Sequence, residues 1–217
     1  MIRQVPFARH ATSSETHVVW YVAPMLLPHA SALYKFGDPS PEDHAWVFGN
    51  TWAVEGVADD RRLTIAPNAR HVGIITRLTE LMQDPMWLLY VLVVPRGGGE
   101  AGRYQSSEPQ SREQVRAFLG EFGSFLETDG RHHLWIRSVA DGAMLVYDRH
   151  NLIYAYGHLE EWKLLLRQIG MKEVAPAAIK VPVPHSHQYH ELFDQEEHRL
   201  LSYLPWHQSP LREQDQQ

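Results

Sequence analysis

Apolar and polar residues alternate through the middle of the chain in a way that predicts strands followed by a helix. The segments HHLWIRS, from His132, and AMLVYDR, from Ala143, flank a turn that contains Asp141-Gly142, a dipeptide typical of tight hairpin turns. NLIYAYG then predicts a third strand, and HLEEWKLLLRQIG predicts a helix that ends at Gly170. This block predicts antiparallel strands backed by a helix.

Helical spacing of apolar residues recurs at three other places. It predicts a first helix over 69–83 and a last helix over 189–204. Between them, Ser111 and Gln114 form a capping box at the start of a helix over 111–128. We expect the apolar stripe of this helix to pack against a strand at 86–94 and against the strands that begin at His132.

Other segments predict the remaining strands and loops. Continuous apolar residues over 86–94 predict a strand in the middle of a sheet, buried on both faces. The glycine-rich segment 95–110 is expected to be a flexible loop, and the proline-rich segment 174–184 an edge strand or extended connector. Shorter apolar segments predict further strands at 16–22, 44–56 and 61–67.

Together these elements predict a single α+β domain over 17–204. We expect a mixed, mostly antiparallel sheet of about six to eight strands, with about three main helices packed on it. Residues 1–16 are expected to form a flexible N-terminal arm, and residues 205–217 a disordered C-terminal tail.

The composition restricts the class of protein. A chain of 217 residues with 44% hydrophobic and 21% charged residues is typical of soluble globular proteins. Its longest uninterrupted apolar run, Met86 to Val94, is far shorter than the roughly 20 residues of a membrane helix. There are no cysteines and no basic-then-apolar leader, so we expect a cytoplasmic protein without disulfides or thiolate metal sites.

The charge and the aromatic content point to a binding role. Acidic residues outnumber basic ones by 26 to 20, whereas nucleic-acid binders normally show the opposite balance. The chain has 7 tryptophans, a residue enriched at protein-binding hot spots. We therefore predict a non-enzymatic, cofactor-free protein, immunity-like or regulatory, whose partner is another protein and neither nucleic acid nor a membrane.

No assembled catalytic motif accompanies this pattern. Gly97, Gly99 and Gly102 have the spacing of a dinucleotide-binding loop, but a polar segment with Pro109 separates them from the next helix. A pyrophosphate site requires that helix to follow directly, so the spacing predicts only a surface loop. Nucleophile-elbow, Walker and H-E-x-x-H motifs are absent from the sequence.

An alternative prediction comes from the 14 histidines, several of which lie near the C-terminus. Three imidazoles within six residues can bind one zinc ion, and residues four apart share a face where the segment from Tyr189 onward is helical. The alternative function is therefore a zinc-dependent hydrolase or a metal-binding protein. Its candidate metal ligands are His185, His187, His190, Asp194 and His198.

A smaller polar cluster surrounds the predicted hairpin. His132 and His133 are adjacent on a strand and point to opposite faces, so they cannot join one site. His150 lies in a turn, where Asp148 or Asp141 could form a general acid/base pair with it. Turn chemistry alone also explains aspartate at those positions.

Overall fold

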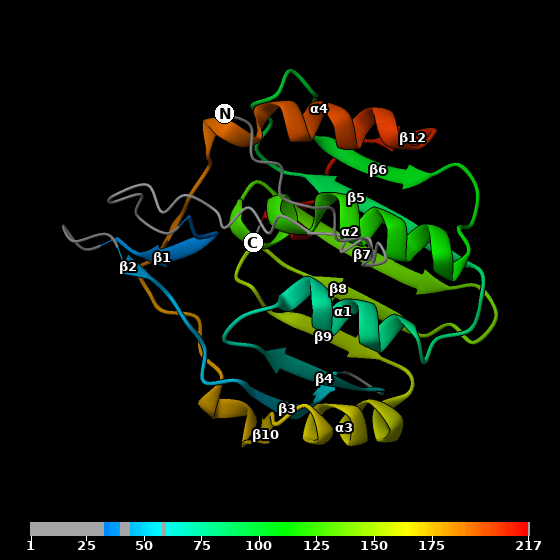
Figure 1. The fold of residues 1–217 in the computed structure, drawn as a ribbon. Coiled ribbons are helices and arrows are strands. Elements are labelled where there is room, and N and C mark those ends of the chain that lie inside the picture. The colour runs from blue at the N-terminus through cyan, green and yellow to red at the C-terminus, as the bar shows by residue number, and fades with distance from the viewer. Residues whose placement is uncertain (1–32, 40–43, 58–59, 217) are drawn as a thin grey trace, which may run out of the picture. The chain divides into compact units, whose positions relative to one another are not determined.

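The computed structural model describes residues 33–39, 44–57 and 60–216, and its main feature is a nine-stranded sheet (Figure 1). In chain order its strands are β3 (Thr51–Val57), β4 (Asp60–Ala66), β5 (Met86–Leu92), β6 (Gly102–Ser106), β7 (His132–Ser138), β8 (Met144–Tyr147), β9 (Ile153–Tyr156), β10 (Lys172–Glu173) and β12 (Trp206–Ser209). Their spatial order is β10-β3-β4-β9-β8-β7-β5-β6-β12. Every pair is antiparallel except β10 with β3, so the predicted mixed, mostly antiparallel sheet is confirmed.

A second, smaller sheet lies beside one end of the large one (Figure 1). It has the order β11-β1-β2 and consists of β1 (Phe36–Asp38), β2 (His44–Ala45) and β11 (Ser186–His187). The helices are α1 (His71–Thr79), α2 (Arg112–Thr128), α3 (Leu159–Gln168) and α4 (Asp194–Tyr203), with 3-10 turns η1 (Pro176–Ala178), η2 (Glu191–Phe193) and η3 (Glu213–Gln216). These elements confirm the predicted α+β class.

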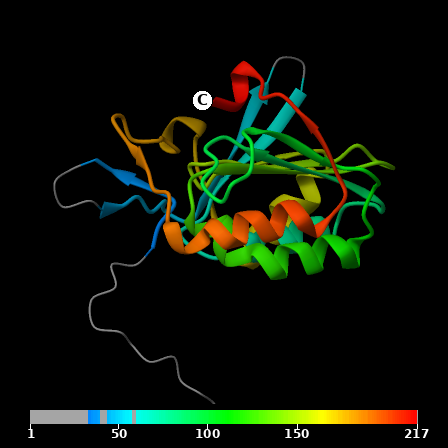
Figure 2. The same cartoon turned by 90° about the horizontal axis from the view of Figure 1, so that it is seen from above.

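The helices cover one face of the nine-stranded sheet (Figure 2). Helix α2 begins at the predicted capping box, because the Gln114 amide donates to Ser111 Oγ at 3.3 Å and the Ser111 amide donates to Gln114 Oε1 at 2.7 Å. Its stripe of valine, leucine and phenylalanine side chains is buried in the same core cluster as Leu88 and Tyr90 of β5. The predicted packing of this helix on the strand at 86–94 is confirmed.

The opposite face of the sheet carries no α-helix of the described residues, and the C-terminal turn η3 lies on that side (Figure 2). Trp87 and Leu89 of β5 and Trp135 of β7 are therefore only half-buried there. The prediction that the strand at 86–94 is buried on both faces is wrong. All four helices pack on one face of the sheet. Every second side chain of a strand points to the other face, which is more open.

The sheet has more strands than the six to eight predicted, and the described residues form four α-helices rather than about three. Strand β6 lies in the segment 95–110, which was expected to be a flexible loop, and β12 lies in the expected disordered tail, 205–217. Both belong to one sheet edge, where β6 pairs with β5 and β12. The polar side chains of β12 are exposed, whereas Arg103 and Ser106 of β6 are polar but buried, so neither strand shows the hydrophobic alternation that predicts strands.

Two C-terminal segments also differ from expectation. Helix α4 begins at Asp194 rather than near residue 189, because η2 precedes it. The segment 174–184 contains the turn η1 and no named strand, so it is a connector. The predicted arm over 1–16 and strand over 16–22 lie outside the described residues. Among the helices of the described ranges, none is long and apolar enough to cross a membrane.

Candidate metal centre

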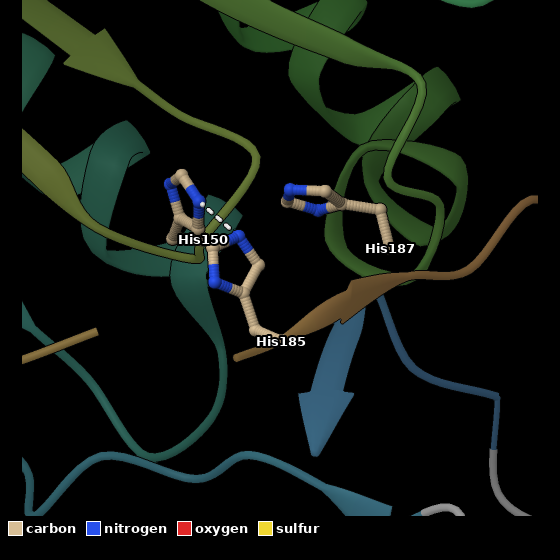
Figure 3. Close-up of side chains that lie close together, drawn as sticks. All are labelled: His150, His185 and His187. Carbon is tan, nitrogen blue, oxygen red and sulfur yellow. Dashed lines mark hydrogen bonds between the residues drawn. The ribbon is translucent and has the colours of Figure 1, made fainter. Parts of the chain in front are cut away.

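Three histidines from distant parts of the chain meet between the two sheets. His150 lies in the turn that joins β8 to β9, His185 lies just before β11, and His187 lies within β11 (Figure 3). Each of the three offers one ring nitrogen, and these nitrogens all lie within 4.8 Å of one another. Figure 3 shows the rings facing a common space.

The β8–β9 turn holds His150 in place through its neighbours. The Asp148 carboxylate accepts the backbone N–H groups of His150 and Leu152, each at 2.9 Å. Asn151 has a positive φ of 62°, a conformation that asparagine tolerates better than most residues, and its side chain accepts the Tyr147 hydroxyl at 2.6 Å. The turn is therefore closed by its own polar side chains.

The short sheet holds the other two histidines. His187 pairs with Phe36 of β1 in the antiparallel ladder, and the buried Phe36 ring contacts all three imidazoles. The ring-centroid distances from Phe36 are 5.6 Å to His150, 6.2 Å to His185 and 6.3 Å to His187. An apolar side chain thus supports the cluster without competing for its nitrogen atoms.

The hydrogen bonds of two rings determine which nitrogens carry protons. His150 Nδ1 lies 3.2 Å from Asp148 Oδ2, and His185 Nδ1 lies 2.9 Å from the Pro182 carbonyl oxygen. A carboxylate and a carbonyl only accept, so both Nδ1 atoms donate, and in the neutral rings both Nε2 atoms are unprotonated. These two Nε2 atoms nevertheless lie 3.2 Å apart.

Two lone pairs at this separation repel each other unless a shared proton or a metal cation lies between them. Zinc binds imidazole nitrogen at about 2.0–2.1 Å, so two nitrogens of a tetrahedral site are about 3.3 Å apart. The observed separation of 3.2 Å between His150 Nε2 and His185 Nε2 agrees with that value. These two rings therefore have the spacing of adjacent zinc ligands.

His187 supplies the third imidazole. Its Nδ1 is buried and has no hydrogen-bond partner within the described residues. Burial, followed by the positive charge of Arg149 and the neighbouring imidazoles, lowers the pKa of His187 to about 3. The ring is thus neutral near pH 7 and keeps a lone pair for a ligand.

Two charged residues next to the cluster have opposite effects on a bound cation. Burial favours the neutral form of Asp148, but its hydrogen bonds from His150 and from the Leu152 amide outweigh burial and lower its pKa. Asp148 is thus a carboxylate that orients a metal-ligand candidate through the opposite ring nitrogen, a common arrangement around zinc. Arg149 is largely buried nearby and disfavours a cation.

A cavity of about 480 Å³ opens beside His150 and His185 on the helix-free face of the sheet. A metal ion bound by three imidazoles would have a coordination position left for water or substrate. The cavity gives such a molecule a place next to the site. Its other lining residues are Arg62, His133, Trp135, Val146, Asp148, Tyr154, Val181, Val183, Gln214 and Asp215.

The structure brings together two of the five metal-ligand candidates of the sequence, His185 and His187, and places the other three elsewhere. His190 Nε2 lies 2.9 Å from the Tyr34 carbonyl oxygen. Asp194 forms ion pairs with Arg96 at 3.2 Å and Arg131 at 3.1 Å, and His198 is exposed on α4. These three do not share one helical face, because His190 precedes the helix.

His150 is the member of the cluster that sequence reasoning did not connect to a metal. The structure pairs it with Asp148, one of the two partners considered, while Asp141 instead accepts from His158 Nε2 at 2.8 Å. The local signal was the spacing of an aspartate two residues before a histidine in a turn. That His150 lies close to His185 can be known only from the folded structure, because the two residues are far apart in the sequence.

Comparisons of the chain with protein-family models, with curated proteins and with solved structures found no match. Any functional assignment therefore depends on the geometry of the site. That geometry is a set of three imidazoles, one of them oriented by a carboxylate, next to a cavity.

Proposed function

We propose that this protein binds a zinc ion through His150, His185 and His187, and that the ion promotes hydrolysis of a substrate in the adjacent cavity. The observation that supports this most directly is the 3.2 Å separation of His150 Nε2 and His185 Nε2, two nitrogens whose opposite ring nitrogens both face an acceptor. A third imidazole nitrogen lies within 4.8 Å. This arrangement is the alternative function that the histidine content predicts, with a different set of ligands.

The donor atoms favour zinc over harder cations. Imidazole suits zinc, copper, nickel and iron, whereas magnesium and calcium prefer oxygen ligands. Zinc sites with four protein ligands are structural, and sites with three protein ligands keep a position for water. Zinc lowers the pKa of that water to about 7, which supplies a hydroxide nucleophile near neutral pH.

Zinc content tests the ligand set. We expect the wild-type protein, equilibrated with zinc and then freed of excess metal, to retain about one zinc per chain. His187→Ala removes one ligand and should abolish this retention, whereas His198→Ala changes an exposed histidine outside the cluster and should preserve it. Elemental analysis measures the metal, and circular dichroism confirms that both variants are folded.

Two results would contradict the site: wild-type protein that holds no zinc, or His187→Ala protein that holds as much as His198→Ala protein. Hydrolysis is then tested with p-nitrophenyl acetate and p-nitrophenyl phosphate. Turnover by zinc-loaded protein that disappears in His187→Ala supports the hydrolase. Equal rates for both proteins would leave a metal-binding protein without this activity.

The aspartate that orients His150 gives a second, graded prediction. Asp148→Asn weakens the hydrogen bond to His150 Nδ1, and the loss of such an outer-shell partner typically lowers zinc affinity about 10- to 100-fold. Asp141→Asn is the matched control, because Asp141 accepts from His158 outside the cluster. Competition with a zinc-binding dye measures both affinities. Equal affinities for the two variants would contradict the role of Asp148.

A further inference from the structure

The helix-free face of the sheet carries rows of side chains that cross several strands. Trp87 of β5 lies opposite Arg137 of β7, which lies opposite Met144 of β8. The next row along the strands runs from Leu89 to Trp135 and on to Val146. Cross-strand neighbours of this kind have Cβ atoms about 4.5–5.5 Å apart, so each row forms a continuous surface.

A hollow of about 350 Å³ lies over these rows, within the range of small-molecule sites. It is lined by two tryptophans, two arginines, Leu89, Gln105 and Met144. One of the arginines, Arg103, is buried and neutralised by Asp215 at 2.5 Å. The other, Arg137, is exposed and forms no ion pair or hydrogen bond within the described ranges.

The hollow therefore has a free positive charge between planar aromatic surfaces. Arg137 can donate two parallel hydrogen bonds to a carboxylate or phosphate group. Trp87 and Trp135 are half-buried and offer apolar area for a flat ligand. The complementary ligand is an anion attached to a planar apolar body.

Trp135 lines both this hollow and the cavity beside His150 and His185, and the ion pair of Arg103 with Asp215 lies between the two. The Asp215 carbonyl oxygen also lies 3.1 Å from His133 Nε2, so η3 covers part of β7 between Arg137 and the Asp148–His150 turn. The hollow at Arg137 is therefore a site separate from the cavity beside the histidines.

We propose that the surface formed by Trp87, Trp135 and Arg137 binds an anion attached to a planar apolar body. The anion is a carboxylate or a phosphate group. This binding is independent of the metal.

Calorimetric titration with three small molecules tests the surface: 2-naphthoate, 2-naphthyl phosphate and the neutral 2-naphthamide. We expect at least one anion to bind about tenfold more tightly than the amide, the value of a charge-assisted hydrogen bond. Arg137→Gln should lower the affinity for that anion about tenfold and leave the affinity for the amide unchanged. Arg77→Gln, which removes an exposed arginine on α1, is the matched control and should change neither affinity.

The two anions distinguish a carboxylate site from a phosphate site, since the preferred one should bind more tightly. Equal binding by Arg137→Gln and Arg77→Gln, or no saturable anion binding below about 5 mM, would overturn the proposal. The same titration of His150→Ala separates it from the metal site. If His150→Ala loses zinc but still binds the anion, the proposed anion site is supported. If the protein binds zinc but no anion, the anion site is refuted and the metal site is not affected.

Discussion

Replacing Arg131 with methionine is expected to lower the free energy of unfolding by about 3–5 kcal/mol. The Arg131 guanidinium is fully buried and contacts the buried carboxylates of Asp129 at 2.8 Å and Glu197 at 2.7 Å. Burial disfavours its charge, but the hydrogen bonds with both carboxylates outweigh burial and raise its pKa. Methionine keeps much of the side-chain volume and leaves two buried carboxylates without their cation.

Urea unfolding of the variant at pH 7 measures this loss. Arg199→Met is the control, because Arg199 is exposed and pairs with Glu196 at 2.7 Å on the same helix. Exposed pairs of this kind contribute under about 1 kcal/mol. A loss in Arg131→Met that is no larger than in Arg199→Met would show that the buried network does not stabilise the fold.

The same network explains the glycine-rich loop that resembles a dinucleotide-binding sequence. Glu197 accepts the Gly97 amide at 2.8 Å and the Arg96 amide at 3.0 Å. A Cβ on Gly97 would collide with the Asp194 carbonyl oxygen. The glycines thus allow the loop to approach helix α4, and their loop amides contact a carboxylate of the chain itself rather than a pyrophosphate.

The sequence predicted those turns and helix ends that depend on residues close together in the chain. The Asp141-Gly142 turn joins β7 to β8 as expected, with Gly142 at φ 72°, and Gly170 at φ 83° follows α3. Strand β12 was missed because its polar residues WHQS pair with β6, about a hundred positions earlier, and no local pattern encodes that pairing.

The candidate site was only partly predictable for the same reason. His185 and His187 are close in sequence, so their spacing alone suggested a metal site. His150 joins them because β11 pairs with β1, which places His187 opposite Phe36 beside the β8–β9 turn. The protein-interaction role drawn from charge and tryptophan content stays a prediction.

Acidification is expected to destabilise the protein steeply between pH 6.5 and pH 4. Burial lowers the pKa of His71 and of His133 from 6.5 to about 4. Burial and then the charge of Lys35 hold the pKa of His132 well below its usual range. In the unfolded chain these histidines take up protons near pH 6.5, so the unfolded state binds more protons than the folded state below that pH.

The stabilisation from these groups is therefore complete above pH 6.5 and is lost as the pH falls towards 4. A pKa difference of about 2.5 corresponds to about 3 kcal/mol for each histidine, so His71 and His133 together account for up to about 6 kcal/mol. Urea unfolding of metal-free protein at half-unit steps from pH 7.5 to pH 4.5 measures the loss. A free energy of unfolding that stays level over this range would refute the prediction.

A substitution of His71 measures the contribution of this one histidine to the pH dependence of stability. His71 stacks on Tyr147 with ring centroids 5.8 Å apart and planes 25° apart, and its Nε2 has no hydrogen-bond partner within the described residues. His71→Phe preserves a flat ring and removes the titrating group. Between pH 6 and pH 4.5, the free energy of unfolding of the variant should fall less steeply than that of the wild type. The difference between the two slopes should be about 1.4 kcal/mol per pH unit. Parallel curves for the two proteins would show that His71 is already protonated in the fold, or that it never titrates differently from the unfolded chain.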